Sequence, residues 1–173
     1  QNLGLLLEGN PNIIPCTPYG ILEILKFYDI PVSGRHAVIV GRSKIVGKPM
    51  FALLSQKHEM GNATVTICHT GTKDLIDHTK RADILIAAAG SPEMINGDMV
   101  KEGVDIIDVG INRINDNTKK GYHLVGDVDT ESVMGIAHSI TPVPGGVGPM
   151  TITMLLYNTV IAAEKCRQLE AAV

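Results

Sequence analysis

The sequence predicts an α/β fold of the Rossmann type, a doubly wound and mostly parallel sheet with helices on both faces. Three observations favour this fold. Short apolar runs alternate with helix-like segments along the chain. The run Val38-Ile39-Val40 breaks at Gly41 and restarts as a helix, an arrangement that turns backbone N–H groups and a helix dipole toward an anion. Glycine-bearing turns also follow the other predicted strands. A nucleotide cofactor is therefore the first hypothesis.

The first third of the chain leads into this motif. Leu3 to Ile14 is apolar and broken by glycine, without a sustained period, so we expect an entry loop or linker. Thr17-Pro18 predicts a helix start, with a hydroxyl N-cap and proline at the first helical position. That helix is expected to end near Pro31 and Gly34. His36 to Val40 is predicted to be the first strand, short and apolar as a strand buried on both faces should be.

The remaining elements continue the alternation. The predicted strands are Thr64–Cys68, Asp83–Ala88, Asp105–Val109, His123–Gly126 and Ser139–Thr141, and the predicted helices are Lys48–Glu59, Lys73–Arg81, a short turn at Gly97–Lys101 and a long helix from about Pro149 to Ala171, capped by Gly148. Asn115–Tyr122 is polar and rich in turn-forming residues, which predicts an exposed loop.

Composition excludes several classes of protein. The chain has 173 residues, enough for one sizeable core, and its net charge of −3 offers no basic surface for nucleic acid. Cys16, Cys68 and Cys166 are odd in number and widely spaced, which favours reduced thiols and excludes a disulfide framework or a zinc site. The histidines are equally scattered, so we expect no metal. No stretch approaches about 18 uninterrupted apolar residues, so we expect no membrane span.

The location follows from similar arguments. The first ten residues lack the charged start and apolar centre of a signal peptide. We therefore expect a cytoplasmic protein, and an organellar one if a targeting segment lay upstream.

The glycine turn after the first strand departs from the usual dinucleotide motif. Gly41 supplies the tight turn and Gly47 a close backbone approach or the entry to the helix, but Ser43 and Val46 replace the middle and last glycines of G-x-G-x-x-G. An ordinary strand-to-helix turn without a ligand is the alternative interpretation of these residues.

The end of the second predicted strand indicates which cofactor would bind. Sites for NAD usually carry Asp or Glu there, whereas sites for NADP carry hydroxyl and basic groups. Here the strand ends in Cys68-His69-Thr70, with Thr72, Lys73 and, as a further candidate, Arg42 nearby, which favours NADP over NAD. Lys73 on a solvated helix start is the alternative. For His69, a hydrogen-bonded structural role is more typical than a cofactor contact or proton donor.

Three further features could carry chemistry. Pro142 to Thr151 holds three glycines and three prolines before a long helix, so it could form a rigid turn whose amides face a substrate, or a stiff linker. Asp127 lies among apolar residues, and an N-cap role for Asp127 or Asp129 explains it as well as catalysis does. Cys16 between two prolines could be a reactive thiol, but a small packing residue is the more typical role.

Five stretches occur together and in one order. They are Pro15–Pro18, Gly41–Met50, Asp108–Arg113, Val125–Val128 and Pro142–Thr151. Together they closely resemble the bifunctional methylenetetrahydrofolate dehydrogenase/methenyltetrahydrofolate cyclohydrolase family over nearly the whole chain. The resemblance implies a homodimeric enzyme of one-carbon metabolism, which oxidises methylenetetrahydrofolate with NADP and hydrolyses the methenyl product to formyltetrahydrofolate.

The resemblance also implies site residues. The cofactor-binding residues would be Gly41, Arg42, Ser43, Thr70 and Ile111, with Thr70 near the ribose phosphate and Ile111 on the nicotinamide side. The residues that contact the folate would be Pro144, Gly145, Gly146, Val147, Gly148 and Thr151. Thr70 departs from the Ser or Arg expected at its position.

The family's catalytic Tyr and Lys belong to an N-terminal folate-binding domain, and this chain contains no matching tyrosine-to-lysine motif. We therefore expect residues 1–14 to be a linker or remnant of that missing domain, and residues 15–173 to be the cofactor domain, without a catalytic residue of its own. Little activity is expected from the chain alone. Two alternatives stay open: a non-catalytic dinucleotide-binding or dimerisation module, and another Rossmann-type enzyme such as a methyltransferase.

Overall fold

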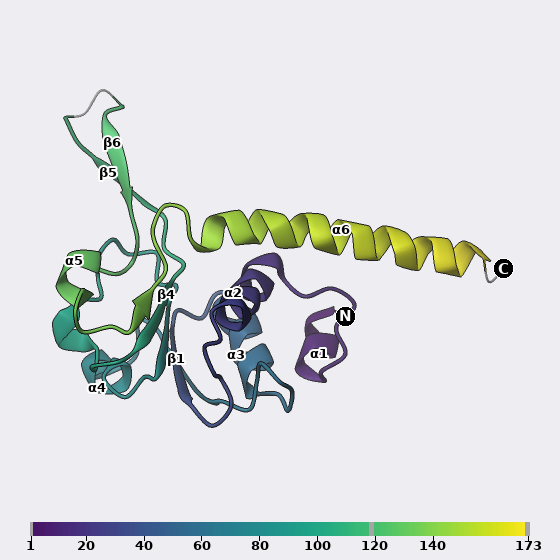
Figure 1. The fold of residues 1–173 in the computed structure, drawn as a ribbon, viewed down its shortest axis with the longest axis horizontal. Coiled ribbons are helices and arrows are strands. Elements are labelled where there is room, and N and C mark those ends of the chain that lie inside the picture. The colour runs from purple at the N-terminus through teal and green to yellow at the C-terminus, as the bar shows by residue number, and fades with distance from the viewer. Residues whose placement is uncertain (1, 118–119, 172–173) are drawn as a thin grey trace.

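The computed structural model describes residues 2–117 and 120–171, which form a five-stranded parallel sheet with helices on both faces (Figure 1). The predicted fold class is confirmed. Parts of three predictions lie outside the described residues: residue 1 of the linker, residues 118 and 119 of the exposed loop, and residues 172–173 of the cofactor domain.

The sheet has the strand order β2-β1-β3-β4-β7. Its strands are β1 (His36–Val40), β2 (Thr64–Cys68), β3 (Ile84–Ala87), β4 (Asp105–Asp108) and β7 (Ser139–Ile140). The chain runs outward from β1 to β2 and then crosses back to β3 on the other side of β1. The strand order therefore reverses between β1 and β3, and the crevice beyond the carboxyl ends at such a reversal is where doubly wound folds bind ligands.

Alternate residues of the central strands supply two hydrophobic cores, one on each face of the sheet. Ile39, Ile86 and Ile107 pack with α2 (Cys16–Phe27), α3 (Gly47–Ser55) and the start of α6 (Val147–Ala171). Val38, Leu85 and Ile106 face the other layer, formed by α4 (Leu75–Thr79), the 3₁₀ turn η1 (Gly97–Met99) and α5 (Thr130–Val133). The centres of β1, β3 and β4 are apolar because both of their faces are covered.

Residues near the N-terminus differ from the prediction. Asn2–Leu7 forms the helix α1 rather than a loop, and Leu6 is fully buried in the core beside α3. The Gln56 side-chain amide donates to the Leu6 carbonyl. The helix α2 begins at Cys16, so Thr17 lies inside it and is not its N-cap. Cys16 is partly buried, and Asn158 of α6 donates to its Sγ at 3.5 Å.

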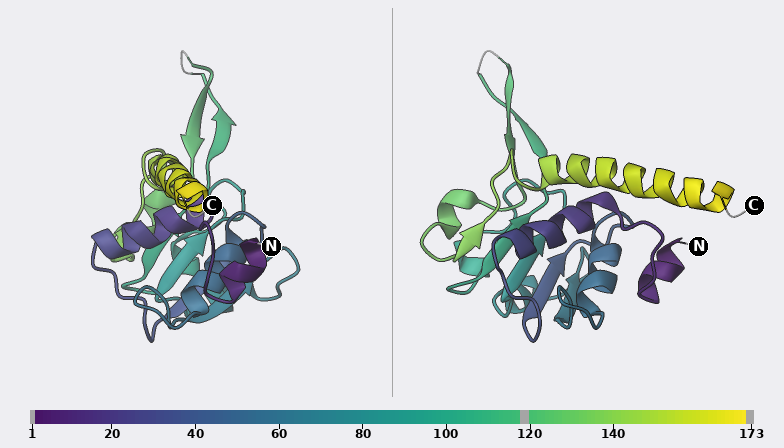
Figure 2. Two further views of the ribbon diagram at one scale, coloured as in Figure 1. Left: turned by 90° about the vertical axis from the view of Figure 1, so that its right-hand side faces the viewer. Right: turned by 45° about the vertical axis from the view of Figure 1, so that its right-hand side comes forward.

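A second difference concerns the segment after β4. The strands β5 (Asn112–Asn115) and β6 (Tyr122–Val125) form an antiparallel hairpin, of which the sequence predicted only the second strand. The Arg113 guanidinium lies 3.9 Å from the centre of the Tyr122 ring. The hairpin and α6 project away from the sheet in different directions, as Figures 1 and 2 show.

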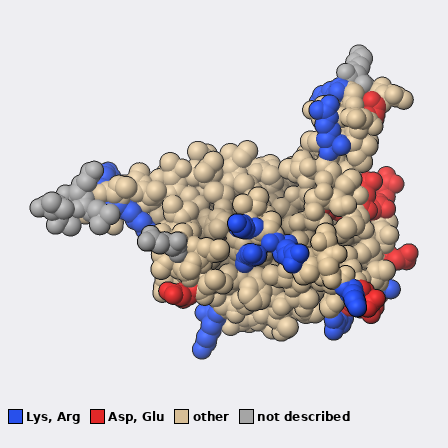
Figure 3. Space-filling model, turned by 180° about the vertical axis from the view of Figure 1, so that it is seen from behind, with Lys and Arg blue, Asp and Glu red and all other residues tan. Residues whose placement is uncertain are grey.

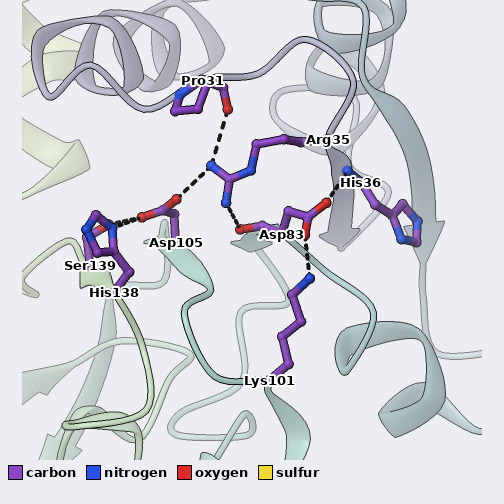
Figure 4. A network of polar contacts seen from close by, with 8 residues as sticks. All are labelled: Pro31, Arg35, His36, Asp83, Lys101, Asp105, His138 and Ser139. Carbon is purple, nitrogen blue, oxygen red and sulfur yellow. Dashed lines mark hydrogen bonds and ion pairs between the residues drawn. The ribbon is translucent and has the colours of Figure 1, made fainter.

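A polar network joins the amino ends of the strands, at the edge opposite the crevice (Figure 4). Arg35 donates to Asp105 at 2.8 Å and to the Asp83 carbonyl at 2.7 Å, and Asp105 also accepts from His138 and Ser139. Burial raises the pKa of Asp105, but the hydrogen bonds from His138, Ser139 and Arg35 outweigh it and hold that pKa below its usual value. The amino ends of the strands are therefore fixed by ion pairs and hydrogen bonds.

Candidate functional site

We use the word crevice for the region beyond the carboxyl ends of β1 and β3, where the strand order reverses. Gly41, directly after β1, lies at its centre. Gly41 has a φ of +130°, and a Cβ there would come closer than 3.0 Å to the carbonyl oxygen of Ala88, after β3. A Cβ at Gly47 would likewise overlap the Gly41 carbonyl. The ends of β1 and β3 and the start of α3 thus approach each other at backbone distance. The predicted tight turn at Gly41 and close approach at Gly47 are confirmed.

The loop between Gly41 and α3 presents backbone donors. The Ser43 hydroxyl accepts from the N–H groups of Val46 (3.0 Å) and Gly47 (3.4 Å), and the Ser43 carbonyl accepts from Lys48. These bonds satisfy the N–H groups at the start of α3, and the next residue, Pro49, has no N–H group. Within the described part of the chain, the N–H groups of residues 42–45 make no hydrogen bond. The donors that could bind an anion therefore lie in the loop before the helix, and Arg42 and Ser43 are exposed beside them.

The turn after β2 borders the crevice on one side. Thr70 is exposed there. The predicted structural role of His69 is confirmed, because its ring Nδ1 accepts from the Gly71 N–H at 3.0 Å and its backbone N–H donates to the Thr72 hydroxyl at 2.8 Å. Lys73 is exposed and precedes α4, whose first residue is Leu75, so it does not lie on a helix start.

The turn after β3 borders the other side, and a buried carboxylate holds it. Asp127 is fully buried, and its Oδ2 accepts from the N–H groups of Ala89 (2.6 Å) and Gly90 (2.8 Å). Its Oδ1 accepts from the Ser91 N–H (3.0 Å) and from the Asn112 side-chain amide (2.8 Å). The amides of this turn are therefore occupied by the protein's own carboxylate. Sequence reasoning missed this role because the partners of Asp127 are far away in the chain.

A second buried carboxylate, Asp108 at the end of β4, supports the first. It accepts from the backbone N–H groups of Gly110 (2.9 Å), Asp127 (3.0 Å) and Val128 (2.9 Å). Burial raises the pKa of Asp108 above its usual value, against these three hydrogen bonds, which lower it. Of the two aspartates proposed as N-caps, only Asp129 caps a helix, accepting from the Ser132 N–H in α5.

The predicted folate contacts are divided between the surface and the core. Ile111 is 60% exposed after β4, and a Cβ at Gly148 would lie 3.7 Å from its Cδ1, so the proline-glycine stretch reaches Ile111. The Val147 side chain is buried, and the Thr151 hydroxyl donates to Thr17 Oγ1 at 3.0 Å and to the Val147 carbonyl at 3.1 Å. Pro144 and Gly145 are exposed. The structure thus brings Gly148 to Ile111 and takes the side chains of Val147 and Thr151 into packing.

A cavity of about 690 Å³ lies elsewhere, beside the edge strand β7. Ile24 and Phe27 of α2 and Ile140 of β7 line it, together with Gly145 and Gly146. It contains two of the predicted folate contacts and none of the predicted cofactor contacts.

The surface and the described side chains add three observations. Figure 3 shows a group of basic side chains near the centre of one face, with the acidic side chains toward its rim. Over residues 2–117 and 120–171, no three His, Cys, Asp or Glu side chains are arranged to hold a metal ion. No described helix combines the length and the apolar character needed to cross a bilayer.

Comparisons with known proteins agree with this geometry. The family model described as "Tetrahydrofolate dehydrogenase/cyclohydrolase, NAD(P)-binding domain" matches residues 15–167. Bifunctional protein FolD 1 of Haloarcula marismortui is 57% identical over 162 residues, which cover 94% of this chain and 54% of that protein. FolD of Chlorobium phaeobacteroides is 59% identical over 162 residues, covering 92% and 55%. The chain therefore spans about half the length of the relatives it matches.

Two solved structures are similar as well. The bifunctional FolD enzyme of Campylobacter jejuni has a TM-score of 0.84 and 49% identity, covering 95% of this chain and 55% of its own. A Trypanosoma brucei FolD complexed with NADP and an inhibitor has a TM-score of 0.86 and 39% identity, covering 95% and 56%. The match over residues 15–167 shows that the chain belongs to the tetrahydrofolate dehydrogenase/cyclohydrolase family, as its NAD(P)-binding domain.

Proposed function

We propose that this chain binds NADP in the crevice between β1 and β3. The observation that carries the proposal is the close approach at Gly41 beside the unbonded N–H groups of residues 42–45, which can receive the phosphates that link the two nucleosides. Thr70 and Arg42, both exposed, supply a hydroxyl and a positive charge for the 2′-phosphate. Arg is suited to this because its guanidinium donates two parallel hydrogen bonds to a phosphate.

The substrate side of the proposal rests on the segment after β4. If the nicotinamide extends from the phosphates toward Gly110 and Ile111, the proline-glycine stretch lies next to it, since Gly148 adjoins the Ile111 side chain. Hydride transfer needs the folate methylene carbon in contact with the nicotinamide ring. Residues 144–148 would form the folate-facing wall of such a contact through their backbone, because the Val147 side chain is buried.

The complete enzyme would carry both reactions, the NADP-dependent dehydrogenase and the cyclohydrolase. We propose that its folate domain, with the catalytic Tyr and Lys, packs on α6. Four apolar side chains of that helix are 55–65% exposed, namely Ile152, Leu155, Leu156 and Val160. Exposed apolar surface of this kind marks an interface. The chain alone would then bind the cofactor but catalyse little.

The free thiols of Cys16, Cys68 and Cys166 support a cytoplasmic, reducing location.

We also propose a homodimer. Among the described strands, β7 ends the sheet and has one unpaired edge, beside the 690 Å³ cavity. Phe27 and Tyr28, which line that cavity, are 78% and 68% exposed. A second copy would cover these aromatic rings and the strand edge. Sedimentation velocity of the chain and of a Phe27→Ser variant tests this part. A monomeric wild-type chain at micromolar concentration would contradict it.

The alternative is a dinucleotide-binding or dimerisation module without a catalytic role. The proposed folate-facing segment at residues 144–148, of which Gly148 adjoins Ile111, favours the enzyme. A module that bound only a dinucleotide would have no use for a second ligand-facing segment. Joining the chain to a relative's folate domain and assaying NADPH formation separates the two functions.

The cofactor is tested by calorimetric titration of the chain with NADP and, separately, with NAD. We expect saturable binding of both, with NADP tighter by about tenfold or more, since one extra charged hydrogen-bonding group is worth about 1.5–3 kcal/mol. Arg42→Ala should weaken NADP binding and leave NAD binding nearly unchanged. Lys26→Ala, which removes a positive charge at the end of α2, is the matched control and should change neither. Equal affinities for the two cofactors would contradict the proposal.

A further inference from the structure

We propose that Asp127 is a positioning residue for the nicotinamide half of the dinucleotide. Its buried carboxylate joins the turn after β3 to the segment after β4, and so fixes the wall against which the nicotinamide lies. The inference rests on the proposed function, because it concerns the same crevice.

The hydrogen bonds of Asp127 connect two separate segments. Three of its donors are consecutive backbone N–H groups, those of residues 89–91, and the fourth is the side-chain amide of Asn112. Asn112 directly follows Ile111, and the same amide also donates to the Gly126 carbonyl at 3.1 Å. One carboxylate therefore determines the distance between the β3 turn and the residue next to Ile111.

Backbone packing leaves this arrangement little freedom. A Cβ at Gly110 would come closer than 3.0 Å to both the backbone nitrogen and the carboxylate of Asp127, and a Cβ at Gly126 would overlap the Asp108 carboxylate. Asp108 accepts from the Asp127 N–H, so the first carboxylate holds the backbone that carries the second. The segment that presents Ile111 is thus packed directly against the two aspartates.

The Asp127 carboxylate also makes the two sides of the crevice differ in which backbone N–H groups can bind a phosphate. Consecutive N–H groups that point to one place form an anion site. After β3 this site is filled by the protein's own carboxylate, whereas the N–H groups of residues 42–45 make no hydrogen bond in the described part of the chain. The phosphates of the cofactor are therefore directed to the loop after β1. The β3 turn acts as a rigid wall rather than as a phosphate ligand.

Strand order determines which half of the cofactor depends on Asp127. The β1 loop lies in the middle of the crevice, the β2 turn with Thr70 lies on one side, and the β3 and β4 ends lie on the other. Dinucleotides cross such a crevice with the adenosine at the second strand. The nicotinamide is then on the side of Asp127, and the 2′-phosphate is remote from it.

A pair of ligands tests this assignment. The chain is titrated with NADP and with 2′-phospho-ADP-ribose, which has the adenosine, the phosphates and both riboses but lacks the nicotinamide. In Asp127→Asn the amide NH₂ must face N–H donors, so one side of the carboxylate loses its hydrogen bonds. We expect NADP affinity to fall by about tenfold or more and 2′-phospho-ADP-ribose affinity by less than about threefold.

Two more variants keep the test decisive. Asp129→Asn changes a neighbouring carboxylate that only caps α5, and should alter neither affinity. If Asp127→Asn does not fold, as judged by circular dichroism, Asn112→Ala replaces it. This variant removes the fourth donor to Asp127 and the hydrogen bond to the Gly126 carbonyl but keeps the three backbone donors, so it should give a smaller loss of NADP affinity with the same preference. Equal weakening of both ligands in a folded variant, or unchanged NADP binding, would overturn the inference. A wild-type chain that binds neither ligand would instead contradict the proposed function, and the inference with it.

Discussion

Gly41→Ala perturbs the crevice at a point where the ends of β1 and β3 are in backbone contact. The substitution adds a Cβ that would come closer than 3.0 Å to the Ala88 carbonyl oxygen, on a backbone whose φ is +130°. Two costs therefore add: the strain of a positive φ and the overlap with a neighbouring strand end. Two other glycines carry only one of these costs each, so substitutions there measure the costs separately. Gly103 has a φ of +75° with nothing near its would-be Cβ, whereas Gly47 has the overlap without a positive φ.

The magnitudes follow from these contacts. A positive φ costs a residue with a Cβ about 1–2 kcal/mol, and forcing an extra carbon into a packed region costs about 1–3 kcal/mol. Gly103→Ala should then lower the free energy of unfolding by about 1–2 kcal/mol, Gly47→Ala by about 1–3 kcal/mol and Gly41→Ala by about 2–5 kcal/mol. Each Gly→Ala change lowers the conformational entropy of the unfolded chain by the same amount, so this contribution cancels when the three variants are compared.

Urea unfolding followed by circular dichroism measures these differences. With about 2–4 °C of melting temperature per kcal/mol for a chain of this size, Gly41→Ala should also melt about 4–20 °C below the wild type. If Gly41→Ala were no less stable than Gly103→Ala, the strand ends would not approach each other at Gly41, and the account of the crevice would be wrong.

Further predictions concern the cofactor, the core and pH. Thr70→Asp should reverse the preference for NADP over NAD, because a carboxylate accepts from ribose hydroxyls and repels a phosphate; an unchanged ratio in paired titrations would exclude Thr70 from the adenosine end. Leu6→Ala should lower the unfolding free energy by about 2–5 kcal/mol, since Leu6 is fully buried, whereas Leu3→Ala on the same helix, at a side chain 44% exposed, should cost about 0.5 kcal/mol; equal costs would mean that α1 is not packed. The urea midpoint should fall as the pH drops below about 4. The pKa values of Asp83 and Asp105 are lowered in the folded chain, so the stability they contribute is complete above their unfolded pKa and is lost as the pH falls through the folded pKa. Asp105→Asn should make this acid dependence shallower, and an unchanged dependence would contradict the role of the network at the amino edge.

Most of the sheet could be predicted from local pattern alone. The bounds of β1 and β2 agree with the predicted strands, because both are short apolar runs that end at turn-forming residues. The first hairpin strand was missed because Asn112–Asn115 has a single apolar residue, Ile114, and is half exposed, which resembles a loop. The helix α1 was missed because Gly4 interrupts its pattern, and only its packing through Leu6 reveals its role.

Part of the candidate site could be predicted from the local sequence, and part could not. Gly41 and Gly47 could be predicted because a strand, a glycine turn and a helix are adjacent in sequence. The hydrogen bond between Asp127 and the Ala89 N–H joins residues 38 apart in sequence, and the one between Thr151 and Thr17 joins residues 134 apart. Neither therefore leaves a local pattern in the sequence. Buried polar groups find their partners through the tertiary fold, which single-sequence patterns do not describe.

Binding of NADP in the crevice between β1 and β3 can be followed residue by residue through the amide chemical shifts of the isotope-labelled chain during an NADP titration. We expect the largest changes at residues 42–45, Thr70 and Ile111, and little change at the amides lining the cavity beside β7. Large changes confined to that cavity, with residues 42–45 unmoved at saturating NADP, would contradict it.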